Sequence, residues 1–284
     1  MAVKRVGIVG SGIMGSGIAE VAAKAGFEVV LRSRAQSTAD AMVAGLEKSL
    51  GRQVEKGRLG EPERDAALAR VRAVADLGEL AECDLVIESI VEDLPAKKHL
   101  FSELDRICAD SAILATNTST LPVVELAMET GRPGLVCGIH FFNPASAMPL
   151  VEVVRSITTT DETVEAARGF AEACGKTPVL VKDQAGFIVN ALLFPYLNNA
   201  VKLLDAGVAT RDDIDTAMKG GCNFPMGPLE LLDLVGLDTS LAILEALYAE
   251  FRDPNYAPAP LLKRMVAAEK LGRKARQGFY DYRK

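Results

Sequence analysis

A glycine-rich turn near the first residue constrains the fold of this chain more than any other feature. The β-branched run Val6-Gly7-Ile8-Val9 leads into Gly10-x-Gly12-x-x-Gly15, and residues 18–23 then follow a helical pattern. A strand, a glycine turn and a helix form the context in which this pattern binds a dinucleotide. The alternative is a turn with a structural role alone.

Each glycine of the turn has a separate physical role. Gly10 permits the tight turn, Gly12 lets the backbone approach a pyrophosphate at the positive end of the helix, and Gly15 lets helix and strand pack closely. We therefore expect a dinucleotide to contact the turn and the first helical residues, which are Gly10, Gly12, Ile13, Met14 and Gly15.

The end of the second predicted strand indicates which dinucleotide is preferred. Residues 27–32 run into Arg32-Ser33-Arg34. A carboxylate about 20 residues past the glycines usually binds the ribose 2′-hydroxyl and repels a 2′-phosphate. A serine between two guanidinium groups should do the reverse, since each charge-assisted contact to phosphate contributes about 1.5–3 kcal/mol. NADP(H) is therefore expected. The alternative is that the arginine pair is merely solvated and that the site also accepts NAD(H).

Composition excludes several classes of protein. With 284 residues the chain can form two domains. Its net charge of −6 argues against nucleic acid as a general partner. No apolar stretch approaches the roughly 18 residues of a membrane span, and a strand expected from Val3 leaves no room for a signal peptide. Five scattered cysteines without a Cys-x-x-Cys indicate neither a disulfide framework nor a metal site, so a cytoplasmic protein is expected.

Strand and helix patterns alternate over residues 1–183, and only helical patterns follow. This order predicts a Rossmann-like, doubly wound, mostly parallel sheet in a dinucleotide-binding domain over 1–183, and an all-helical substrate and dimerisation domain over 184–284. The strands are expected at 3–9, 27–32, 71–75, 84–90, 111–115, 135–140, 150–155 and 177–182. The helices are expected at 16–25, 35–56, 62–69, 94–107, 161–173, 185–206, 210–219, 227–251 and 256–270.

One helix of the second domain is apolar on nearly every face. Residues 187–204 contain few polar side chains, and a helix of that kind must be buried on all sides. About 100 residues offer little interior, so we expect a homodimer through this domain. The alternative is a helix that its own domain covers completely. Pro195 should kink or break the helix.

A histidine and a glutamate are placed symmetrically about a predicted loop. His140 ends one predicted strand, Glu152 lies in the next, and Ser146 is midway between them. If the two strands pair as a hairpin, both side chains stand side by side. An unpaired carboxylate among valines would be costly, whereas a His–Glu pair forms a general base. The alternative is a structural histidine and a solvent-facing glutamate.

Three further groups could bind a ligand. Asn117 and Ser119 follow the strand 111–115, although this polar cluster could instead cap a helix over 122–129. Asn190 lies in an apolar helix, where its amide needs either a ligand or a backbone partner. A cationic stripe on the helix 35–56 suits a phosphorylated substrate handle or, alternatively, a solvated face; its members are Lys48, Arg52 and Lys56.

Taken in order, these motifs resemble those of the short-chain 3-hydroxyacyl-CoA dehydrogenases over nearly the whole chain. The matching segments are Gly10–Gly15, Asn117-Thr-Ser119, His140-Phe-Phe-Asn-Pro144, Leu150-Val-Glu152-Val, Gly186-Phe-Ile-Val-Asn190, Pro225-Met-Gly-Pro-Leu-Glu-Leu231 and Gly278-Phe-Tyr280. The resemblance implies a nucleotide-binding domain, an all-helical dimerising domain and an acyl-CoA substrate.

The resemblance also implies roles for single residues. His140 matches the catalytic base, Glu152 its partner, and Ser119 and Asn190 the residues that bind the reacting oxygen of the substrate. The positions expected to contact the cofactor are Glu92, Lys97, Asn117, Asn143 and Lys274. Those expected to bind the CoA phosphates are Lys48, Arg52 and Lys56.

The sequence departs from the family pattern in three places. Ser33 replaces the usual ribose-binding aspartate, Ala191 replaces the arginine after Asn190, and the loop around Lys274 lacks the usual Thr/Ser-Gly. The implied reaction is the reversible NAD(P)-dependent oxidation of a (3S)-3-hydroxyacyl-CoA, such as the 3-hydroxybutyryl thioester. Alternatives are a longer or carboxylated acyl-CoA, a free hydroxy or sugar acid, and a non-catalytic cofactor-binding protein.

Overall fold

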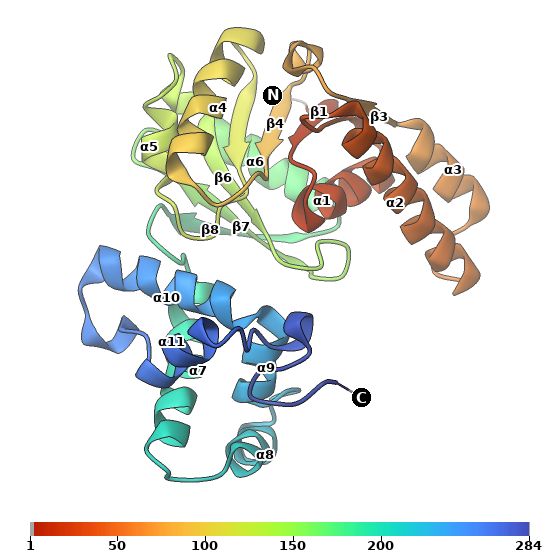
Figure 1. Ribbon diagram of the computed structural model, residues 1–284. Helices are drawn as coiled ribbons and strands as arrows, with labels where there is room; N and C mark the ends of the chain where they lie inside the picture. The colour runs from red at the N-terminus through yellow and green to blue at the C-terminus, as the bar shows by residue number, and fades with distance from the viewer. Residues whose placement is uncertain (1–2, 284) are drawn as a thin grey trace. The chain divides into compact units, whose positions relative to one another are not determined.

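The computed structural model describes residues 3–283, and the chain divides between Asp183 and Gln184 into two compact units (Figure 1). The first unit contains one eight-stranded sheet of order β3-β2-β1-β4-β5-β6-β7-β8. Every neighbouring pair is parallel except β6 and β7, which are antiparallel, so the predicted doubly wound, mostly parallel sheet is confirmed. The strands are β1 (Arg5–Val9), β2 (Glu28–Arg32), β3 (Val71–Val74), β4 (Leu85–Glu88), β5 (Ile113–Thr116), β6 (Val136–Phe141), β7 (Leu150–Arg155) and β8 (Thr177–Lys182).

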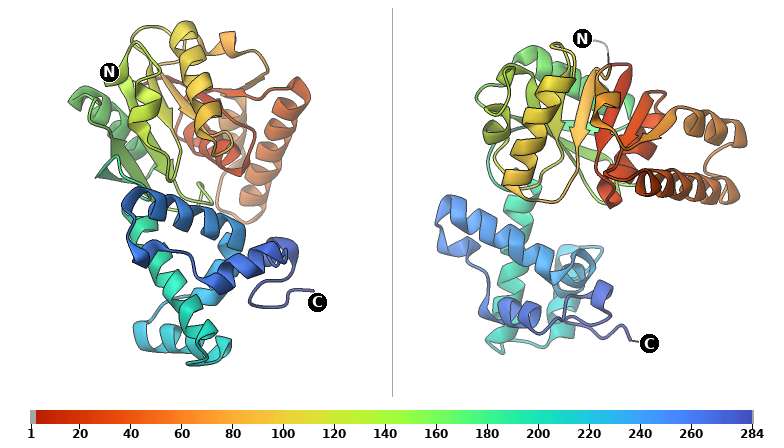
Figure 2. Two further views of the ribbon diagram at one scale, coloured as in Figure 1. Left: turned by 60° about the vertical axis from the view of Figure 1, so that its left-hand side comes forward. Right: turned by 45° about the horizontal axis from the view of Figure 1, so that its top comes forward.

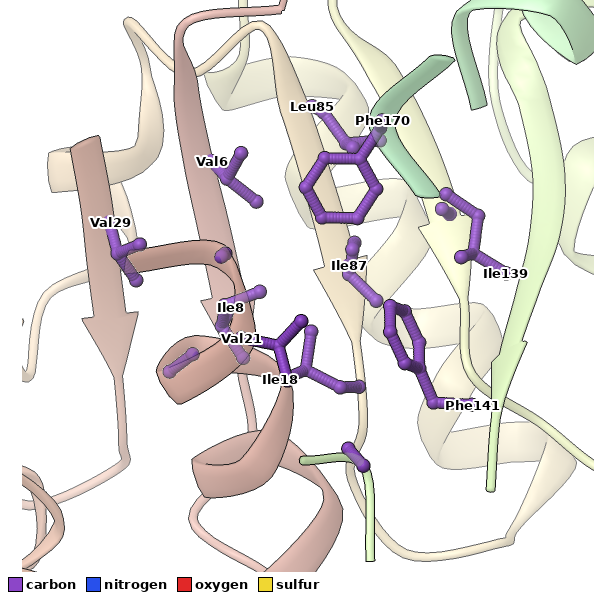
Figure 3. Packing of buried hydrophobic residues seen from close by; sticks show 14 of the residues in the cluster. Val6, Ile8, Ile18, Val21, Val29, Leu85, Ile87, Ile139, Phe141 and Phe170 are labelled. Atoms are coloured by element: carbon purple, nitrogen blue, oxygen red, sulfur yellow. The ribbon is translucent and has the colours of Figure 1, made fainter. Parts of the chain in front are cut away.

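Helices lie on both faces of this sheet (Figure 2). One face packs against α1, α2 and α6, where Ile18 and Phe170 meet strand residues such as Ile8 (Figure 3). The other face lies against α5, since a Cβ on Gly138 would touch both Val154 and Val123. The α-helices of this unit are α1 (Ile13–Lys24), α2 (Gln36–Glu55), α3 (Glu61–Ala69), α4 (Leu94–Ile107), α5 (Val123–Ala127) and α6 (Asp161–Ala173), and its 3₁₀ turns are η1 (Leu77–Leu80) and η2 (Pro133–Leu135).

Burial of both faces explains the composition of the central strands. All four residues of β4 and of β5 are buried, and these strands read as nearly continuous apolar runs. That pattern is typical of parallel strands covered by helices on both sides. Glu88, the last residue of β4, is the one charged side chain among these eight residues.

The second unit is helical. Its core contains Phe194 and Leu197 from α7, Leu229 from α9 and Leu244 from α10. Apart from isolated bridges near Gln277, its described residues form no strand. The helices are α7 (Val189–Asp205), α8 (Arg211–Cys222), α9 (Pro228–Val235), α10 (Leu237–Phe251) and α11 (Pro260–Ala267), with 3₁₀ turns η3 (Pro254–Tyr256) and η4 (Arg273–Ala275). No helix within residues 3–283 is long and apolar enough to cross a membrane.

Three details of the helical prediction are wrong, and the first is that the helix expected over 256–270 covers only Pro260–Ala267. The helix expected over 227–251 is divided into α9 and α10 at Gly236, whose φ of 103° is incompatible with a continuous helix. The helix expected from residue 185 begins at Val189, because Gly186 and Phe187 have φ values of 75° and 46°. Pro195 lies inside α7, which continues to Asp205, so the proline does not break the helix.

Candidate active site

The glycine turn leaves room for a ligand at one residue only. Gly10 has a φ of +133°, and a Cβ there would lie 2.2 Å from the carbonyl oxygen of Ser89. A Cβ on Gly15 would lie 2.1 Å from the carbonyl oxygen of Gly10, whereas a Cβ on Gly12 would meet nothing within 4 Å. Gly12 is also the N-cap of α1. The turn therefore has the open backbone and helix N-terminus that a pyrophosphate needs.

The candidate 2′-phosphate residues lie beside this turn. The amide of Gly10 donates to the carbonyl oxygen of Arg32 at 3.1 Å. Arg32 Nε donates to the carbonyl oxygen of Ala75 at 3.1 Å, and partial burial lowers the pKa of this guanidinium. Ser33 is 4% exposed, while Arg34 is exposed. Of the two arginines, Arg34 is the one whose charge is open to solvent.

His140 and Glu152 face each other across the β6–β7 hairpin. Their Cα atoms are register partners, and His140 Nδ1 lies 2.8 Å from Glu152 Oε2. The two side chains are 8% and 1% exposed, and the His140 ring also packs against that of Phe142. The predicted pairing is confirmed, and the alternative of a solvent-facing glutamate is wrong. Because Nδ1 faces the carboxylate, Nε2 is the ring nitrogen suited to exchanging a proton with a substrate.

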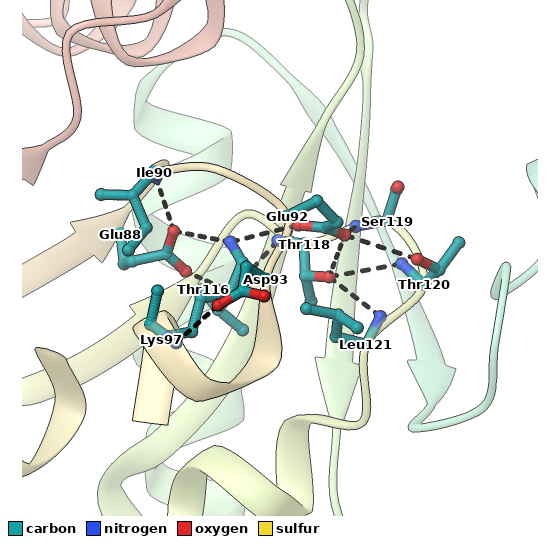
Figure 4. Close-up of polar contacts among 11 residues, drawn as sticks. Glu88, Ile90, Glu92, Asp93, Lys97, Thr116, Thr118, Ser119, Thr120 and Leu121 are labelled. Carbon is teal, nitrogen blue, oxygen red and sulfur yellow. Dashed lines mark hydrogen bonds and ion pairs between the residues drawn. The ribbon is translucent and has the colours of Figure 1, made fainter. Parts of the chain in front are cut away.

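The polar loop after β5 is held by side-chain contacts (Figure 4). The amide of Ser119 donates to Glu92 Oε1 at 3.0 Å, and the Thr118 hydroxyl donates to the same oxygen. Asn117 Oδ1 accepts from the amide of Phe141 at 2.8 Å, which connects the loop to β6 beside His140.

The alternative role of this loop as a helix cap is wrong. The N-cap of α5 is Pro122, and the amides of Val123 and Val124 donate instead to the carboxylate of Asp183, at 2.9 and 2.7 Å.

Lys97 and Glu92, which are both expected to contact the cofactor, differ from each other in exposure. The Lys97 side chain is 1% exposed, and its Nζ lies 2.6 Å from Glu88 Oε1 and 3.2 Å from Glu92 Oε2. The Glu92 side chain is 39% exposed. Burial opposes ionisation of Glu92, yet the Lys97 charge and the hydrogen bonds from Thr118 and Ser119 outweigh it and lower the pKa of this carboxyl.

Sequence reasoning missed Glu88. The sequence predicts it only as part of the strand expected at 84–90, yet it is fully buried and contacts Lys97 and Thr116. The signal that could have found it is a charge at the carboxyl end of an otherwise apolar strand, since a buried carboxylate must have partners.

The remaining candidates are spread over both units. Asn143 is exposed in the loop after β6. Asn190 is 8% exposed at the second residue of α7, and Lys274 in η4 lies 2.6 Å from Asp238, both within the second unit. The cationic stripe of α2 and its C-cap is exposed, and none of its members forms an ion pair within residues 3–283; they are Lys48, Arg52 and the C-cap Lys56.

Two of the buried cysteines have weakly acidic thiols. Burial raises the pKa of Cys137 to about 12 and that of Cys108 to about 11, so these thiols are poor nucleophiles. Within the described part of the chain, no group of three or more His, Cys, Asp or Glu side chains could hold a metal ion.

Two family models cover nearly the whole sequence. The model described as "3-hydroxyacyl-CoA dehydrogenase, NAD binding domain" matches residues 5–184. The model described as "3-hydroxyacyl-CoA dehydrogenase, C-terminal domain" matches residues 186–282.

Individual relatives agree with these models. The 3-hydroxybutyryl-CoA dehydrogenase of Mycobacterium tuberculosis is 47% identical over 283 residues, which are 99% of each chain. The enzyme of the same name from Clostridioides difficile is 45% identical and covers 99% of this chain and 100% of its own. The crystal structure of (S)-3-hydroxybutyryl-CoA dehydrogenase PaaH1 from Ralstonia eutropha matches with a TM-score of 0.97 at 42% identity, over 100% of both chains. The chain therefore belongs to the 3-hydroxyacyl-CoA dehydrogenase family.

Proposed function

We propose that this protein catalyses the reversible oxidation of (3S)-3-hydroxyacyl-CoA to 3-oxoacyl-CoA with a nicotinamide dinucleotide, and that 3-hydroxybutyryl-CoA and acetoacetyl-CoA are its substrate pair. The buried contact of 2.8 Å between His140 and Glu152 carries the proposal. The names of the M. tuberculosis and C. difficile relatives support the choice of substrate.

The chain's own residues perform the proton chemistry. In oxidation, His140 Nε2 accepts the proton of the 3-hydroxyl group, while Glu152 holds Nδ1–H and stabilises the imidazolium that forms. The bound nicotinamide supplies the hydride acceptor. In reduction the imidazolium returns its proton to the developing oxyanion at C3. We assign to Ser119 and Asn190 the hydrogen bonds that orient this oxygen.

The thioester requirement tests the proposal. We expect acetoacetyl-CoA to be reduced and free acetoacetate to be a poor substrate, because the exposed cations of α2 bind the CoA phosphates. The double variant Arg52→Ala/Lys56→Ala should raise KM for acetoacetyl-CoA about 3- to 10-fold with little change in kcat, since each exposed contact contributes roughly 0.2–1 kcal/mol. Steady-state kinetics measures both effects.

The matched control is Arg168→Ala, which removes a half-buried cation from α6. Its KM should equal that of the wild type. Equal turnover of acetoacetate and acetoacetyl-CoA would favour a free hydroxy acid as the substrate. An unchanged KM in the double variant would exclude the α2 stripe as the phosphate site.

We further propose that NADP(H) is preferred over NAD(H). Ser33 offers a hydroxyl where a carboxylate would repel a 2′-phosphate, and Arg34 presents an exposed guanidinium next to it. The kcat/KM for NADPH should exceed the kcat/KM for NADH. Arg34→Ala should lower kcat/KM for NADPH about ten-fold, which is the effect of losing about 1.5 kcal/mol of binding free energy. Its kcat/KM for NADH should not change. A clear NADH preference in the wild type would contradict the proposal.

We also propose a homodimer through the second unit. The apolar side chains of Leu192 and Leu203 on α7 are 72% and 47% exposed, so their own unit does not cover the helix completely. Light scattering should give a mass of twice 30.2 kDa for the wild type and less for Leu192→Asp/Leu203→Asp. The control Ile157→Asp changes an apolar side chain in the first unit that is 94% exposed, and it should remain dimeric. A monomeric wild type would refute the proposal.

A further inference from the structure

The mechanism above does not use Glu88, which is a fully buried carboxylate near the site. Glu88 is 0% exposed at the last residue of β4. Its oxygens accept hydrogen bonds from the Ile90 amide at 2.6 Å, from Lys97 Nζ at 2.6 Å and from Thr116 Oγ1 at 2.8 Å. These donors belong to the loop after β4, to α4 and to the end of β5, so one side chain joins three segments.

Lys97 extends this contact to a second carboxylate. Its buried ammonium lies between Glu88 and Glu92, which are 2.6 and 3.2 Å away. A buried ammonium needs charged partners with good geometry, and the two glutamates provide them. The buried ammonium of Lys97 therefore holds the Glu92 carboxylate in position.

Glu92 in turn organises the loop that carries Ser119. Its Oε1 accepts from the Ser119 amide at 3.0 Å and from the Thr118 hydroxyl. The Thr118 oxygen also accepts from the Leu121 amide at 3.0 Å. On the opposite side, Thr116 Oγ1 donates to Glu88 and accepts from the Thr118 amide at 3.1 Å. Both ends of the loop are thus connected to Glu88 (Figure 4).

We propose that Glu88 is a positioning residue for Ser119: through Lys97 and Glu92 on one side, and through Thr116 on the other, it fixes the loop 117–120. The importance of this loop for turnover rests on the role proposed above for Ser119. Fully satisfied buried polar networks specify one arrangement, and partly satisfied ones lose it. Lys97 then serves the site indirectly, which agrees with its side chain being 1% exposed.

Hydrogen exchange of the full-length protein tests the structural part without any assay of activity. Glu88→Gln keeps the shape of the side chain but removes its charge, and exchange of amides in residues 117–121 should become at least about ten-fold faster. The matched control is Glu20→Gln, at another buried glutamate, which contacts Ser49 and Gln53. It should leave exchange in 117–121 unchanged. If Glu88→Gln does not fold, Thr116→Val removes one hydroxyl of the network and should accelerate the same amides. Wild-type protection in a folded variant would overturn the proposal.

A double-mutant cycle tests the action through Ser119. With acetoacetyl-CoA, Glu88→Gln should lower kcat at least about ten-fold in the wild-type background, since small displacements of positioning groups have effects of this size or larger. In a Ser119→Ala background the same change should lower kcat less than about three-fold, because the group that it positions is gone. Equal effects in both backgrounds would show a general structural role and refute the proposal. If wild type does not turn over acetoacetyl-CoA, the proposed function fails, and the exchange result still decides the positioning role.

Discussion

His140→Ala is expected to lower kcat for acetoacetyl-CoA reduction by at least about 10²-fold, the scale of lost general acid–base catalysis. The substitution removes the imidazole ring that contacts the buried Glu152 carboxylate across the hairpin. The glycine turn lies on a different part of the sheet, so the dissociation constant of the cofactor should stay within about two-fold of the wild-type value. Steady-state kinetics and fluorescence titration with NADPH measure the two quantities separately.

The second histidine provides the control. His99 lies on α4 with its side chain 75% exposed, 3.6 Å from Glu103. His99→Ala should turn over at the wild-type rate. Near-normal turnover by His140→Ala, measured beside this control, would exclude His140 as the acid–base group.

Glu152→Gln is expected to lower kcat about 10- to 100-fold. The amide has nearly the shape of the carboxylate, but it cannot stabilise an imidazolium by charge, and such a hydrogen bond contributes about 1.5–3 kcal/mol. Because Glu152 is 1% exposed, water does not replace the lost interaction. The pH profile of kcat should also change, because the uncharged amide cannot stabilise the imidazolium as the carboxylate does.

The pH profile separates this role from a structural one. Glu20→Gln makes the same chemical change at a buried glutamate that contacts Ser49 and Gln53. That control should leave both kcat and its pH profile as in the wild type. A Glu152→Gln enzyme with an unchanged profile would contradict the pairing in catalysis, whatever its rate.

The sequence was sufficient where the controlling interactions are local. The His140–Glu152 pair could be predicted because a hairpin places residues symmetrically about its loop, and Ser146 marks the midpoint. The glycine turn could be predicted because the strand, the turn and the helix that define it are consecutive in the sequence. The sheet followed from the alternation of strand and helix patterns.

Longer-range contacts, and the backbone conformation of one glycine, decide what the sequence did not show. The division of α9 from α10 at Gly236 follows from its φ of 103°, which no periodicity predicts. The helix expected over 122–129 is present as α5, but the carboxylate that accepts hydrogen bonds from its first amides is Asp183, some 60 residues away. The sequence does not distinguish the two arginines beside Ser33, whereas the hydrogen bond from Arg32 Nε to the carbonyl oxygen of Ala75 does.

Glu88 shows the same limit at the candidate site. Its partners Lys97 and Thr116 come from a helix and a neighbouring strand, and hydrophobic periodicity contains no information about such pairs. The rule that every buried charge must have a partner would have selected Glu88. It would not have identified Lys97 and Thr116 as the partners.

The most direct test of the central claim is the pH dependence of kcat/KM in both directions, from initial rates with acetoacetyl-CoA and with (3S)-3-hydroxybutyryl-CoA. If His140 is the single acid–base group, reduction should fall and oxidation should rise with pH through the same inflection, because reduction needs the protonated ring and oxidation the neutral one. Both inflections should vanish in His140→Ala. Inflections that persist in that variant, or that run in the same direction for both reactions, would contradict the account.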